Sequence, residues 1–96
     1  MGPGDLIHRV IRANLAAFRA CYQRELASDP SVEGGGKVVL GFEIDKAGAV
    51  ATARIASTTL NNANVEDCLL RTMRKLRFAP DAPMKLNYPF IFSSGR

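Results

Sequence analysis

The chain has few of the residues from which catalytic and metal sites are usually built. Its 96 residues include one histidine, His8, and two cysteines, Cys21 and Cys68, with no Cys-x-x-Cys pair. A structural zinc site needs four such ligands, so a metal centre is not expected. The nine carboxylates are scattered along the sequence and form no recognisable acid–base pair. We therefore expect a protein that is not an enzyme and that carries no cofactor.

Long apolar runs are also missing. No stretch approaches the ~18–20 apolar residues that a helix needs to cross a bilayer. The run Gly34-Gly35-Gly36 precedes a strand pattern and not the Gly-Lys-Ser/Thr start of a helix, which argues against a Walker phosphate loop. Hydrophobic residues make up 47% and charged residues 23%, which is typical of a folded domain. We predict one domain over residues 5–94, preceded by a linker of residues 1–4.

The charge balance is basic, with a formal net charge of +4. This charge permits an acidic protein, an anionic lipid surface or nucleic acid as a partner. An RNA-recognition motif would require a strand before the first helix and stacking aromatics in a glycine-rich signature, and the sequence has neither. No nucleic-acid partner is expected, and a basic domain that binds nucleic acid or anionic lipid is kept as an alternative.

Two segments have apolar residues at the three- and four-residue spacing of an amphipathic helix. The first covers residues 5–28 and ends before Pro30, and its apolar positions are Ile7, Ile11, Leu15, Phe18, Tyr22 and Leu26. Asn14 falls on the apolar side of this helix, where we expect its side chain to bond to a nearby backbone group. The second follows Asn64, its expected N-cap, and its apolar positions are Val65, Leu69, Met73 and Leu76.

Three segments alternate between apolar and polar residues, as strands do when one face is buried. Their apolar positions are Val38, Leu40, Phe42 and Ile44 in the first, Val50 and Ile55 in the second, and Leu86, Tyr88, Phe90 and Phe92 in the third. Val50 and Ile55 have opposite parity, so we expect either a bulge between them or one apolar side chain that faces outward. The resulting prediction is an α+β fold in the order α-β-β-α-β. It has a three-stranded antiparallel sheet of order 2-1-3 and two helices on one face.

The two cysteines fall on the inward faces of the two predicted helices. If both helices cover the same face of the sheet, Cys21 and Cys68 are neighbours and form a disulfide. The alternative is a pair of buried free thiols, which would pack as small hydrophobic side chains.

The third strand is the candidate binding site. Pro89 has no N–H to give to a sheet ladder, which places this strand at an edge. Lysine and proline also protect natural edge strands from aggregation, which is the alternative reading. The functional reading is β-augmentation, in which an extended peptide adds a strand. The predicted partner-binding residues are Met84, Lys85, Leu86, Asn87, Tyr88, Phe90 and Phe92.

Several short motifs together carry a family resemblance over nearly the whole chain. They are Cys21-Tyr22-Gln23-Arg24-Glu25-Leu26, Phe42-Glu43-Ile44-Asp45 with Gly48-Ala49-Val50, Val65-Glu66-Asp67-Cys68, Leu76-Arg77-Phe78-Ala79-Pro80 and Tyr88-Pro89-Phe90. In their order and spacing the chain resembles the TonB C-terminal domain. It most closely resembles the AgmX/PglI C-terminal domain family of myxobacterial gliding-motility proteins.

This resemblance implies a periplasmic domain of an energy-transducing or gliding-motility protein that is anchored in the inner membrane upstream of the domain. Such a domain contacts an outer-membrane or periplasmic protein by pairing its last strand, about residues 84–92, with an extended peptide. An oxidising periplasm would also permit the disulfide. The alternative is an envelope scaffold module that forms a homodimer through the same strand.

Overall fold

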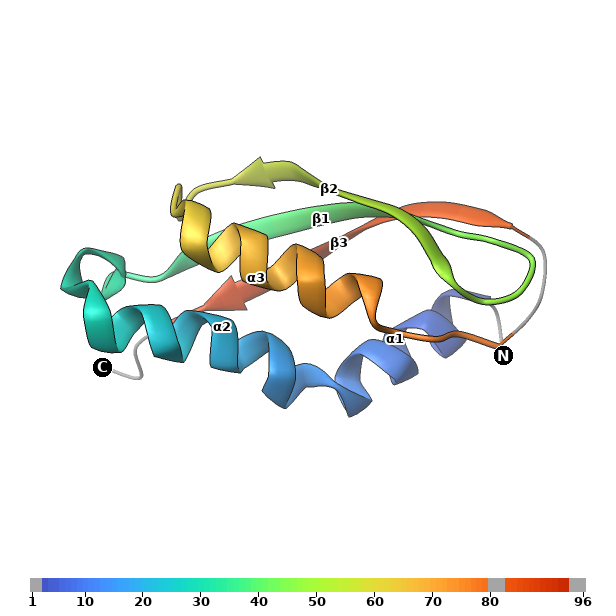
Figure 1. The fold of residues 1–96 in the computed structure, drawn as a ribbon, viewed down its shortest axis with the longest axis horizontal. Helices are drawn as coiled ribbons and strands as arrows, with labels where there is room; N and C mark the ends of the chain where they lie inside the picture. The colour runs from blue at the N-terminus through green and yellow to red at the C-terminus, as the bar shows by residue number, and fades with distance from the viewer. Residues whose placement is uncertain (1–2, 80–82, 94–96) are drawn as a thin grey trace.

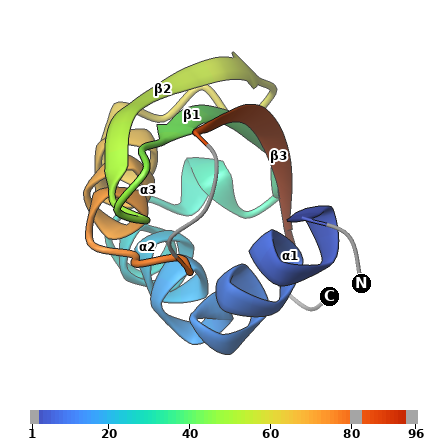
Figure 2. The same cartoon turned by 90° about the vertical axis from the view of Figure 1, so that its right-hand side faces the viewer.

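A computed structural model of the chain describes residues 3–79 and 83–93. The elements are α1 (Pro3–Ala13), α2 (Leu15–Ser28), the short 3-10 helix η1 (Pro30–Val32), β1 (Gly36–Ile44), β2 (Val50–Thr58), α3 (Ala63–Arg74) and β3 (Met84–Phe92). The strands form one antiparallel sheet in the order β2-β1-β3. The helices lie beneath one face of this sheet and leave the other face uncovered (Figures 1 and 2). The predicted α+β fold and strand order are confirmed, and the end of the predicted domain at residue 94 lies outside the described residues.

The predicted first helix is in fact two helices, α1 and α2, which meet at Asn14. The Asn14 N–H donates to the Ile11 carbonyl at 3.0 Å, which is the tighter i to i−3 spacing, and its side-chain amide donates to the Val10 carbonyl at 2.8 Å. A short polar side chain that bonds to the backbone competes with the helical ladder and bends or breaks it. The expected backbone bond of Asn14 is therefore confirmed, and the prediction of one continuous helix was wrong.

The hairpin of β1 and β2 contains a bulge, which was one of the two arrangements expected for Val50 and Ile55. Val50 pairs with Ile44 and Ile55 pairs with Leu40, because the register skips Ala51 between them. An extra residue in one strand reverses the parity, so that both apolar side chains reach the helix-covered face. A second register shift between Val39 and Leu40 was not predicted.

Helix α3 begins with a reciprocal cap at Asn62. The Asn62 side chain accepts from the Val65 N–H at 2.8 Å, and the Glu66 carboxylate accepts from the Asn62 N–H at 3.1 Å. Each bond satisfies one backbone donor that the helical ladder leaves unpaired. The prediction of Asn64 as the cap was wrong. Its side-chain amide instead donates to Glu25 on α2 at 3.0 Å.

The core fills the space between the sheet and the helices. Aromatic side chains of β3 stack on those of α2, with ring centroids 4.5 Å apart for Phe18 and Phe90 and 5.3 Å apart for Tyr22 and Phe92. The buried hydroxyl of Tyr22 donates to the Val32 carbonyl at 2.7 Å, so its polar end is satisfied. The inward side chains of β3 therefore attach this edge strand to α2.

A disulfide joins α2 to α3 on the helix-covered side of the sheet. Cys21 and Cys68 are bonded, with their Cα atoms 5.6 Å apart. The predicted disulfide is confirmed, and the alternative of two free thiols was wrong. Within residues 3–79 and 83–93, no helix is long and apolar enough to span a membrane.

Candidate partner-binding edge at strand β3

Strand β3 is hydrogen-bonded to a neighbouring strand on one side only. Its nine residues pair with β1 in unbroken register, from Met84 opposite Ile44 to Phe92 opposite Gly36. In the part of the chain that the structure describes, no strand pairs with its other side. Figure 2 shows β3 at the margin of the sheet, above α1. The side of β3 that faces away from β1 is therefore not hydrogen-bonded to another strand.

The position of Pro89 follows from the direction of the backbone groups in β1. The Lys37 carbonyl accepts from the Thr59 N–H at 2.8 Å, and the Asp45 N–H donates to the Ala49 carbonyl at 2.9 Å, both toward the β2 side. Because backbone groups alternate in direction along a strand, the odd residues of β1 bond toward β2 and the even residues toward β3. Pro89 lies opposite Val39, an odd residue, so its missing N–H would have pointed to the open edge. The β1–β3 ladder consequently loses no bond at the proline.

The same alternation defines what the open edge offers to a partner. The N–H and C=O groups of Lys85, Asn87 and Ile91 point outward, and Pro89 adds a carbonyl alone. An incoming strand could thus exchange two hydrogen bonds with each of three residues and make one with the proline. We call these four residues the open edge.

The side chains of β3 are divided between the core and the solvent. Phe90 and Phe92 are only 4% and 6% exposed, and Met84 and Leu86 are half-buried against the same core. Phe90 and Phe92 therefore support the strand from within, and a docked peptide would not reach their side chains.

Ile91 was missed by the sequence prediction. Its side chain is 79% exposed and lies on the uncovered face of the sheet, where Pro89 is also exposed. The sequence does contain the information needed to find it. Ile91 stands between Phe90 and Phe92, which face the core, so the alternation along the strand places this apolar side chain on the opposite face. Together with the exposed Lys85 and Asn87, it completes a row of outward side chains along the open edge.

Tyr88 connects the strand to α1. Its hydroxyl is hydrogen-bonded to the Nδ1 atom of His8, and the two rings lie 5.7 Å apart between centroids. Partial burial raises the pKa of Tyr88 above its ordinary value, and the nearby positive charge of Arg12 opposes this rise. The His8 side chain is itself exposed to solvent, so this contact lies at the surface beside the candidate site.

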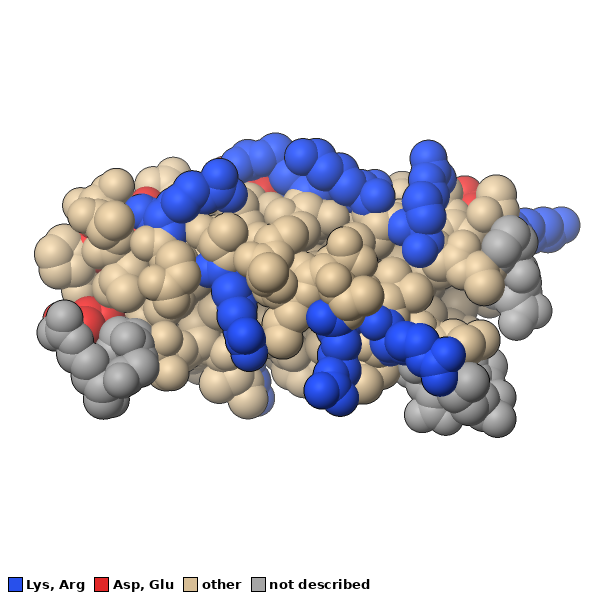
Figure 3. Space-filling model, turned by 90° about the horizontal axis from the view of Figure 1, so that it is seen from below, with Lys and Arg blue, Asp and Glu red and all other residues tan. Residues whose placement is uncertain are grey.

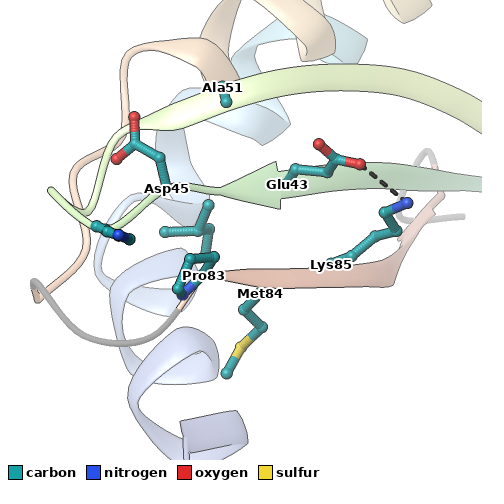
Figure 4. Close-up of a pocket in the computed structure, with 8 residues that line it drawn as sticks. Glu43, Asp45, Ala51, Pro83, Met84 and Lys85 are labelled. Carbon is teal, nitrogen blue, oxygen red and sulfur yellow. Dashed lines mark ion pairs between the residues drawn. The ribbon is translucent and has the colours of Figure 1, made fainter.

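A shallow hollow of about 360 Å³ lies where β3 begins, lined by Glu43, Ile44, Asp45, Lys46, Ala51, Pro83, Met84 and Lys85. Lys85 and Glu43 lean toward each other from adjacent strands, while Met84 points toward α1 (Figure 4). The Lys85 Nζ and Glu43 Oε1 atoms are 3.1 Å apart. Both side chains are well exposed, so this ion pair stabilises the fold little. Among the described residues, no three His, Cys, Asp or Glu side chains are grouped to hold a metal ion.

The face formed by the helices is predominantly basic. Lysine and arginine side chains outnumber acidic ones on this face (Figure 3). Helices α1, α2 and α3 contain two arginines each. Arg24 is already engaged, because its guanidinium donates to Cys68 Sγ at 3.3 Å. Any partner on this side of the molecule meets positive charge.

Comparison of the chain with models of known protein families found no match, and comparison with curated proteins found none either.

Proposed function

We propose that the chain is a protein–protein interaction domain of the bacterial cell envelope, and that it binds an extended partner segment along the open edge. As the resemblance to TonB C-terminal domains implies, its parent would be an inner-membrane-anchored protein of the energy-transducing or gliding-motility type. The domain would lie in the periplasm, and its partner would be a periplasmic or outer-membrane protein.

The open edge itself is the observation that carries this proposal. Main-chain hydrogen bonds supply the affinity in β-augmentation, and alternate side chains supply the selectivity. Lys85, Asn87 and Ile91 provide paired backbone donors and acceptors, in a strand whose opposite side is anchored to β1 without a register break. The strand is also attached to α2 through Phe90 and Phe92, so it is already ordered before a partner arrives.

The disulfide supports the proposed compartment. Disulfides persist in oxidising environments such as the bacterial periplasm and are rare in the cytosol. The Cys21–Cys68 bond joins α2 to α3, and neither cysteine belongs to β3. We therefore assign it to the stability of the domain and not to contact with the partner.

The test is a selection followed by a backbone substitution. Octapeptides selected from a random phage-displayed library on the folded domain should shift the amide resonances of residues 84–92. Asn87→Pro removes one outward N–H without removing a bond to β1, as Pro89 already does. Losing that bond and leaving a peptide carbonyl unpaired should weaken binding by about tenfold or more, since ~1.4 kcal/mol corresponds to a factor of ten.

Asn87→Ala is the matched control, because it removes the same side chain and keeps the N–H. It should bind the selected peptides nearly as well as the wild type. Equal affinity of the proline and alanine variants, or resonance shifts confined to α3 or β2, would contradict the proposal. Sedimentation at increasing concentration checks the homodimer alternative, in which association of the chain with itself would also be lost in Asn87→Pro.

A further inference from the structure

The flank of the open edge is formed by α1. His8 contacts Tyr88 through its ring and its Nδ1 atom. Arg12 follows His8 by four residues, so the two side chains lie on the same side of α1, one turn apart. Partial burial raises the pKa of Tyr88 and the positive charge of Arg12 opposes this rise, which agrees with a position of Arg12 on the side of α1 that borders β3. A polar, basic wall therefore borders β3 on the helix-covered side.

The alternation of the sheet determines which partner residue would meet this wall. Residues directly opposite one another on adjacent strands project to the same face. The side chain of Tyr88 projects to the helix-covered face, toward His8. A partner residue opposite Tyr88 would project to that face as well, beside His8 and Arg12. Partner residues opposite Asn87 and Pro89 would instead project to the uncovered face.

Arg12 has no acidic partner within the part of the chain that the structure describes. An ion pair joins Lys85 to Glu43, on the uncovered face. A guanidinium at the margin of a docking edge favours a carboxylate that can accept two of its hydrogen bonds. It also disfavours a lysine or arginine at the same position, which provides selectivity against basic segments.

We infer that the segment that docks on β3 is acidic, with an Asp or Glu opposite Tyr88 whose carboxylate is held by Arg12 beside His8. This inference rests on the proposed function and specifies the partner of the same site. It is consistent with the basic helix face seen in Figure 3, which would attract such a segment at a distance. The acidic residue fixes the register of the docked strand, because it has to lie opposite Tyr88.

The experiment uses the octapeptides selected on the folded domain. The binding peptides should be enriched in Asp or Glu at one position of the parity that faces the helices. Changing that acid to Lys should weaken binding to the wild type by about tenfold or more. Arg12→Glu should weaken binding of the acidic peptide to a similar degree, and the lysine peptide should recover affinity on Arg12→Glu. Arg74→Glu, which makes the same charge change on α3, should alter neither affinity by more than about twofold.

The outcomes separate this inference from the function on which it rests. If the selected peptides shift residues 84–92 but show no acidic preference, the open edge is a docking site and the charge inference is overturned. The same conclusion holds if Arg74→Glu reduces affinity as much as Arg12→Glu, because net charge alone would then explain the effect. If the peptides bind elsewhere on the domain, both proposals are overturned. Recovery of affinity by the paired charge reversal is the result that supports a direct contact.

Discussion

Reduction of the Cys21–Cys68 bond should remove a large part of the stability of this domain. The bond closes a loop with a sequence separation of 47 residues. The chain-entropy relation gives about 4 kcal/mol for a loop of that length at 25 °C. A chain of 96 residues is expected to have a total free energy of unfolding of roughly 5–14 kcal/mol. The reduced domain should therefore keep a free energy of unfolding of roughly 1–10 kcal/mol, so it remains folded at 25 °C with a smaller margin.

Denaturant unfolding of the oxidised and the reduced wild type measures this effect directly. With a slope of about 2 kcal/mol per molar in guanidinium chloride, the midpoint should fall by about 2 M on reduction. The double variant Cys21→Ala with Cys68→Ala should behave like the reduced wild type, apart from the packing lost with the two sulfur atoms. If the free energy of unfolding falls by less than about 1 kcal/mol on reduction, the loop-closure reasoning is refuted. A fall seen only in the alanine variant would show that packing, and not the cross-link, is responsible.

Two further predictions concern a turn and a titrating group. Gly48 has φ of +87°, and a Cβ added there would overlap the Phe78 carbonyl, so Gly48→Ala should lower stability by at least ~1–3 kcal/mol. The expected fall in Tm is roughly 5–20 °C by thermal melting, while Gly34→Ala, with no atom within 4 Å of the added Cβ, should change it little. Burial raises the pKa of Tyr88 above 10.0, so its contribution to stability is present below pH 10 and is lost as the pH rises through the folded-state value. The difference between the ultraviolet titrations of wild type and Tyr88→Phe should have its midpoint above pH 10, and a midpoint at or below pH 10 would contradict this.

The architecture was predictable from the sequence because apolar periodicity determines which face of each element is buried. The bulge near Ala51 was predictable for the same reason, since Val50 and Ile55 could not otherwise share a face. The helix break was not predicted, although the backbone bond of Asn14 was expected. Periodicity continues through that residue, and the break depends on competition between a side chain and the helical ladder.

The candidate site was predicted less completely than the fold. Pro89 identified an edge strand, but a residue pattern does not show which backbone groups of that strand face outward. That answer required the register, because Val39 lies opposite Pro89 and the carbonyl of Lys37 bonds toward β2. The contact between His8 and Tyr88 joins residues 80 positions apart, so it depends on how α1 packs beneath the sheet.

The outward position of Pro89 has a consequence for association between identical chains. When a foreign strand pairs with β3, a single hydrogen bond is forfeited, because only one proline is present in the ladder. When two copies of β3 pair about a two-fold axis, each copy contributes a proline and two bonds are forfeited. Pro89 therefore costs a homodimeric ladder two hydrogen bonds and a ladder with a different protein only one. This difference favours binding of another protein over self-association.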